Sequence, residues 1–142
     1  SDTMLAFLQR KKEEGYTVLP LSLFPAQDAQ GASQIAALGA ESAIEIHSAE
    51  DFFQASKDAA LCISERLHGA IFSLLSHTPC LLYAESQKNL AFAKDIAIAA
   101  EHCGVCSPVW CYSDLSEAMK KEREAEGLTF GFSEIISFLR ER

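Results

Sequence analysis

The residues of this chain best suited to chemistry are Ser64, Arg66 and His68, which follow a short apolar segment and begin an apolar helical pattern. A helix N-terminus has backbone N–H groups without intrahelical partners, so it favours an anion. We expect Arg66 and His68 to lie in the first turn of this helix. Arg66 would add a fixed charge with forked donors, and His68 can exchange a proton near neutral pH. This combination suits a phosphorylated or carboxylated ligand.

The elements that must position these residues alternate between apolar strands and amphipathic helices. Such alternation indicates βαβ units and a parallel sheet covered on both faces. We therefore predict a single α/β domain over residues 1–142, a Rossmann-like three-layer domain with a mostly parallel sheet. The pattern predicts helices at 4–13, 32–38, 49–57, 65–76, 86–96, 113–124 and 132–140, strands at 17–24, 43–46, 60–63, 80–83 and 106–112, and N-caps at Ser48 and Ser133.

Ligands of parallel sheets bind beyond the carboxyl ends of the strands. The segment from Ser64 to His68, the turn that contains Glu85 and Lys88, and Asp28 would all lie on this edge. We therefore expect one anion-binding site there.

The helix at 65–76 also has a structural interpretation. His68 lies roughly 100° from the apolar stripe of this helix, so it could be a partly buried residue bonded to a carbonyl. Arg66 could pair with Glu65 or Glu85, because structural ion pairs are common. Residues at the spacing of one helix face form the expected core stripe, namely Leu67, Ala70, Ile71, Leu74 and Leu75.

The composition limits the class of protein. The chain has 142 residues, of which 49% are hydrophobic and 23% charged, as in folded globular domains. Its net charge of −8 argues against nucleic acid as a partner, because that binding needs many Lys or Arg contacts to phosphates. No apolar run approaches the ~18 residues that span a bilayer, so we predict no membrane span and a cytoplasmic protein. We expect no cofactor.

The cysteines offer a competing interpretation. Five cysteines without a regular framework favour reduced thiols over a disulfide scaffold. Cys103, Cys106 and Cys111, with His102, could supply enough ligands for zinc. Cys106 and Cys111, however, belong to an apolar strand pattern, in which a free cysteine acts as a small hydrophobe. We predict packing and no metal site.

The segment 62–72, which contains Arg66-Leu67-His68, resembles the polysaccharide pyruvyl transferase family. The resemblance continues through Thr78-Pro79, the strand at 80–83, Lys88 and Phe92, and it covers roughly residues 17–96. Two positions depart from the family pattern. Glu85 stands where Tyr is common, and Gly69 stands where Ala is usual, although Gly in a helix costs about 1 kcal/mol relative to Ala.

The resemblance implies the carboxyl-terminal half of a two-domain enzyme similar to GT-B glycosyltransferases. Such an enzyme transfers pyruvate from phosphoenolpyruvate to hydroxyls of a cell-surface saccharide acceptor as a ketal. By this resemblance Arg66 and His68 are catalytic, and Ser64, Lys88 and Asp28 bind the substrate. We also expect an amino-terminal domain to complete the site, so that these residues alone would have little or no activity.

Two alternatives remain open at this stage. The same sheet edge could bind a nucleotide-sugar donor in one half of a GT-B-type glycosyltransferase, since an Arg near a helix N-terminus suits either donor. The chain could instead be a non-catalytic α/β module for protein association. A stable homo-oligomer that covers the edge with Arg66 and His68 would identify the association module.

Overall fold

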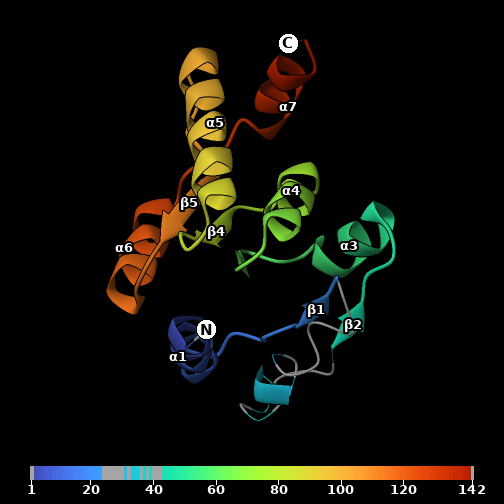
Figure 1. Ribbon diagram of the computed structural model, residues 1–142, viewed down its shortest axis with the longest axis vertical. Coiled ribbons are helices and arrows are strands. Elements are labelled where there is room, and N and C mark those ends of the chain that lie inside the picture. Colours follow the sequence, from blue (N-terminus) through green and yellow to red (C-terminus); the bar gives the residue numbers. More distant parts are fainter. Residues whose placement is uncertain are drawn as a thin grey trace.

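The computed structural model describes residues 2–23, 31, 33–35, 37, 39 and 43–141, in which parallel strands alternate with helices (Figure 1). This confirms the predicted α/β class and its parallel pairing. The expected helix at 32–38 includes residues outside this described part. The elements are α1 (Asp2–Glu13), β1 (Leu21–Ser22), β2 (Ile44–Glu45), α3 (Ala49–Ser56), β3 (Cys62–Ser64), α4 (Leu67–Leu75), β4 (Cys80–Tyr83), α5 (Gln87–Cys103), β5 (Val109–Tyr112), α6 (Leu115–Ala125) and α7 (Phe132–Arg140).

The described strands form two parallel sheets. One has the order β3-β4-β5, and the other contains β1 and β2. β1 is much shorter than the strand predicted at 17–24, because Pro20 has no N–H with which to extend the ladder toward the N-terminus. The Pro20 carbonyl still accepts a bond from Ile44 N at 3.0 Å, and the ladder begins at the next residue.

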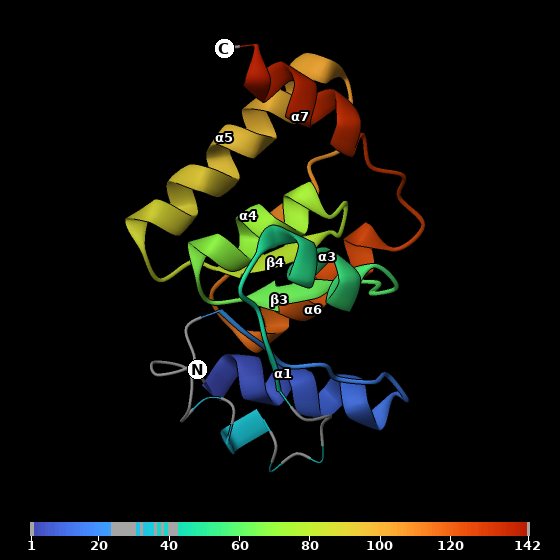
Figure 2. The ribbon, with the colours of Figure 1, turned by 90° about the vertical axis from the view of Figure 1, so that its right-hand side faces the viewer.

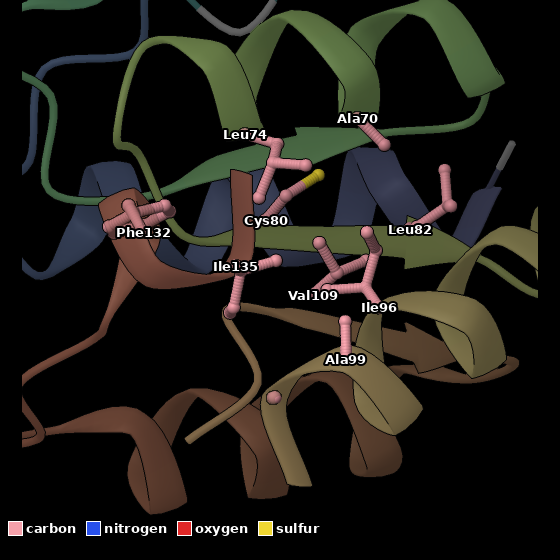
Figure 3. Close-up of a cluster of buried hydrophobic side chains, with 10 residues drawn as sticks. Ala70, Leu74, Cys80, Leu82, Ile96, Ala99, Val109, Phe132 and Ile135 are labelled. Carbon is pink, nitrogen blue, oxygen red and sulfur yellow. The ribbon is translucent and has the colours of Figure 1, made fainter. Parts of the chain in front are cut away.

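β4 separates two layers of helices. Its alternate residues Cys80 and Leu82 face a cluster formed with α4, α5 and α7 (Figure 3). Leu81 faces the opposite cluster, to which α1 and α6 contribute. Figure 2 shows α1 on one side of β3 and β4, with α4 and α5 on the other. These three β4 residues have no exposed surface, as expected for a central parallel strand buried on both faces.

Lys11 connects the two helices of the α1 and α6 layer. Its Nζ lies 2.6 Å from Glu122 Oε1 and 3.0 Å from Glu14 Oε1. Burial alone would lower the pKa of Lys11, but its bonds to the two carboxylates outweigh burial and raise that pKa above the ordinary value. The pair therefore fixes α1 against a helix more than a hundred residues later in the chain.

The helix ends show what the sequence pattern predicted well and what it missed. Ser48 caps α3 as predicted, since its hydroxyl accepts the Asp51 N–H at 3.1 Å. The prediction of Ser133 as an N-cap is wrong. α7 begins at Phe132, whose side chain is buried in the core, so Gly131 takes the cap position and Ser133 falls inside the first turn.

Two predictions about the lengths and faces of helices also need correction. α5 continues to Cys103 instead of ending at Ile96, because no helix breaker intervenes before Gly104, which ends the helix in the left-handed conformation at φ 71°. Leu75 is 47% exposed and does not join the core stripe, because α4 ends at this residue.

Within the described residues, no helix combines the length and apolar character that crossing a membrane requires.

Tyr112 provides a test of the core. It has no exposed surface, and its hydroxyl lacks a hydrogen-bond partner among the described residues. Burial raises the pKa of this hydroxyl well above its ordinary value. A buried donor without a partner costs stability, so Tyr112→Phe should raise the free energy of unfolding by about 1 kcal/mol in urea denaturation.

The half-buried Tyr83, whose ring centroid is 5.3 Å from that of Tyr112, provides the control. Tyr83→Phe should change stability less than Tyr112→Phe. A clear loss of stability in Tyr112→Phe would show that the hydroxyl forms a bond that stabilises the fold.

Candidate functional site

The turn between β3 and α4 consists of Ser64, Glu65 and Arg66, and Ser64 organises its backbone. The Ser64 Oγ accepts the Arg66 N–H at 3.1 Å and donates its proton to the Arg66 carbonyl at 2.8 Å. Arg66 has an extended backbone and occupies the N-cap of α4. It therefore lies immediately before the first helical turn and not within that turn, as was predicted.

Gly69 is buried beneath this turn. A Cβ at this position would overlap the Ser64 hydroxyl and lie 3.0 Å from the Ser64 Cβ. Leu23 Cδ1 would be 4.0 Å away, which is an ordinary van der Waals distance. The glycine that departs from the expected family pattern is thus required by close packing, because a methyl group would displace the hydroxyl that holds Arg66.

The start of α5 lies beside the same turn. Parallel pairing of Ser64 with Leu82 brings the ends of β3 and β4 together, so α4 and α5 begin at one sheet edge. His68 and Lys88 each occupy the second position of their helix, and both are exposed. The structure therefore places both residues on the predicted carboxyl edge.

A cavity of about 640 Å³ lies between residues 17–23, which include β1, and residues 55–63, which lead into β3. Ser64, Glu65, Arg66 and Gly69, which belong to the turn before α4 and to the first turn of α4, are among the residues that line this cavity. The remaining wall includes many apolar side chains from residues 17–23 and 55–63. Two of the predicted site residues, Ser64 and Arg66, thus reach the cavity, whereas His68 and Lys88 do not line it. Asp28 lies outside the described residues.

Asn89 is a residue of this edge that the sequence patterns did not single out. Its side-chain amide donates to the Glu65 carbonyl at 3.0 Å and to the Tyr83 carbonyl at 2.8 Å. The residue is only 3% exposed. The sequence did contain one signal for Asn89. This residue stands three positions after Ser86, the N-cap of α5, and the first turn of that helix lies near the sheet edge.

The cysteines of the competing zinc interpretation are distributed over separate elements. Cys103 ends α5, and its sulfur donates to the Glu134 carbonyl at 3.5 Å. The backbone of Cys106 forms an isolated parallel β-bridge with that of Phe130. Burial raises the pKa of the Cys111 thiol in β5, which disfavours the thiolate that binds metal. The described part of the chain contains no group of three or more His, Cys, Asp or Glu residues arranged to hold a metal ion.

Comparison with known families gives one match. The family model described as polysaccharide pyruvyl transferase matches residues 2–87, more than half of the chain. The match includes α1, which the expected range of 17–96 omitted, and the complete turn with Arg66. It ends one residue before Lys88. No curated protein and no solved structure matches this chain significantly.

The contact between Gly69 and Ser64 can be tested by a double-mutant cycle. Gly69→Ala should lower the free energy of unfolding by about 1–3 kcal/mol, because overpacking outweighs the better helix propensity of alanine. In a Ser64→Ala background the cost should be smaller, since the overlapping hydroxyl is gone. Equal costs in both backgrounds, measured by urea denaturation, would contradict this packing argument.

Proposed function

The chain belongs to the polysaccharide pyruvyl transferase family, and from this premise we propose that its site transfers pyruvate from phosphoenolpyruvate to hydroxyls of the saccharide. The family indicates a transferase with a polysaccharide acceptor. The observation that supports the donor and the ketal product is the position of Arg66, which lines a cavity and occupies the N-cap of α4.

Donor binding follows from charge and hydrogen bonding. Phosphoenolpyruvate has a carboxylate and a phosphate, and either can accept two parallel bonds from an arginine. Ser64 holds the Arg66 backbone, so the Arg66 side chain extends from a fixed point in the cavity wall. Arg66 lines the cavity and also stands at the carboxyl edge of the sheet, so we place the anionic groups of the donor at that edge, which Arg66 shares with His68 and Lys88.

The reaction needs a proton before it needs a nucleophile. Protonation of the methylene carbon of phosphoenolpyruvate makes the central carbon electrophilic. Two acceptor hydroxyls then form C–O bonds to that carbon and lose their protons, while its C–O bond to phosphate breaks and inorganic phosphate leaves. In this proposal protonated His68 is the general acid, two residues after the arginine that holds the donor.

Three further residues complete the proposed site. Lys88, at the corresponding position of the adjacent helix, supplies a second positive charge for the phosphate. Ser64, which lines the cavity and holds the Arg66 backbone, is assigned to substrate binding. Asp28 is assigned to substrate binding from the sequence alone.

The proposal is tested by phosphate release from phosphoenolpyruvate with a panel of saccharide acceptors, using the full-length gene product. His68→Ala should lower kcat by about 10²–10⁴-fold, the usual contribution of a general acid. Arg66→Ala should lower kcat/KM for phosphoenolpyruvate by about a hundredfold or more, because each charge-assisted hydrogen bond contributes roughly 1.5–3 kcal/mol.

Two substitutions distant from the carboxyl edge provide matched controls. His102→Ala removes an exposed histidine in the last turn of α5, and Arg123→Ala removes an exposed arginine on α6. Both should retain normal turnover. Near-normal turnover in His68→Ala or Arg66→Ala would exclude that residue from the mechanism. Binding of a nucleotide sugar without any phosphate release would favour a glycosyltransferase instead.

A further inference from the structure

The Asn89 side chain binds two backbone carbonyls, one just after the end of β3 and the other at the end of β4. Its Nδ2 donates to the Tyr83 carbonyl at 2.8 Å and to the Glu65 carbonyl at 3.0 Å, so both amide hydrogens are used. Its own backbone N–H donates to the Ser86 hydroxyl at 3.1 Å. With only 3% of its surface exposed, the side chain is confined to one orientation.

These bonds extend the connection between β3 and β4 beyond the strand ladder. The last pair of the ladder between β3 and β4 is Ser64 with Leu82, and Glu65 is the residue that follows Ser64. Without Asn89, the Glu65 carbonyl would lose the bond that joins it to α5. Buried or half-buried carbonyls need hydrogen-bond donors, and here the Asn89 side chain donates to one carbonyl at the end of each strand.

The peptide unit between Glu65 and Arg66 is therefore held at both ends. Asn89 binds its carbonyl oxygen, and the Ser64 hydroxyl binds its N–H at 3.1 Å. A peptide unit is planar, so two bonds on opposite sides fix its orientation. The orientation of this peptide plane sets the position of the Arg66 Cα and the direction in which the chain enters α4.

We propose that Asn89 is a positioning residue for the donor site. It orients the peptide that carries Arg66 and couples that peptide to the helix that carries Lys88, its immediate neighbour in the sequence. This inference rests on the proposed function, since it gives the fixed orientation a role in binding the anionic donor. Positioning matters because a displacement of about 1 Å can cost a hundredfold in rate.

The test is Asn89→Asp in the full-length gene product. The new side chain has nearly the same shape, but its carboxylate cannot donate and would face two carbonyl oxygens. We expect the KM for phosphoenolpyruvate to rise by about ten- to a hundredfold, with the KM for the acceptor unchanged. Amide hydrogen exchange at Arg66 should also accelerate without substrate, because the Glu65–Arg66 peptide would lose one of its two bonds.

The pH dependence of Asn89→Asp distinguishes positioning from a general structural effect. When the introduced carboxyl is protonated it can donate one hydrogen bond again. The activity of the variant relative to the unmodified enzyme at the same pH should therefore rise as the pH falls. A ratio that is independent of pH, with normal donor KM and normal exchange at Arg66, would overturn the proposal.

Ser73→Ala is the matched control for stability. Ser73 has no exposed surface, and its hydroxyl donates to the Gly69 carbonyl at 2.8 Å within α4. This variant also loses buried hydrogen bonds, since the same hydroxyl interacts with the Cys62 and Cys80 thiols. It leaves the Glu65–Arg66 peptide bonded, so the donor KM should not change. An equal rise in donor KM in both variants would show a merely structural role for Asn89.

Absence of phosphate release by the unmodified enzyme would reject the proposed function separately. Amide hydrogen exchange at Arg66 would still decide whether Asn89 fixes the turn.

Discussion

The burial of β4 on both faces is the constraint on which the rest of the structure depends. Cys80, Leu81 and Leu82 have no exposed surface, so helices must cover both sides of this short strand. α4, α5 and α7 pack on one face, and α1 and α6 on the other. The parallel pairing of β4 with β3 then determines where α4 and α5 begin, because each follows its strand directly.

This arrangement brings the residues of the proposed site to one edge of the sheet. Two helix N-termini lie side by side, and both present backbone N–H groups that favour anions. Because the chain has a net charge of −8, the proposed anionic donor would be recognised by these local groups against an unfavourable overall charge. Arg66, His68 and Lys88 place positive or protonatable side chains at this edge, although Glu65 and Glu85 are nearby in sequence.

The match to the family ends at residue 87, yet the later residues support the matched part. β5 pairs with β4, and α6 packs against α1 with the bond between Lys11 and Glu122. Asn89, two residues beyond the match, reaches back to Glu65 inside it. The geometry of the matched turn therefore depends on residues that lie beyond the matched range.

Local patterns in the sequence determined most of the elements. Apolar runs bounded by turn residues predicted the bounds of Cys80–Tyr83 and Phe132–Arg140, and Ser48 predicted a helix start, because strand pleating, helix periodicity and capping all involve residues close in the chain. The Arg66 and His68 pair was likewise visible as a candidate site. Only the tertiary structure decided that Gly69 must be small against Ser64, and that Asn89 joins Glu65 to Tyr83. The Asn89–Glu65 bond joins residues 24 positions apart that meet through strand pairing, and Gly69 meets Ser64 where the chain turns from β3 into α4, so neither contact leaves a periodic signal in the sequence.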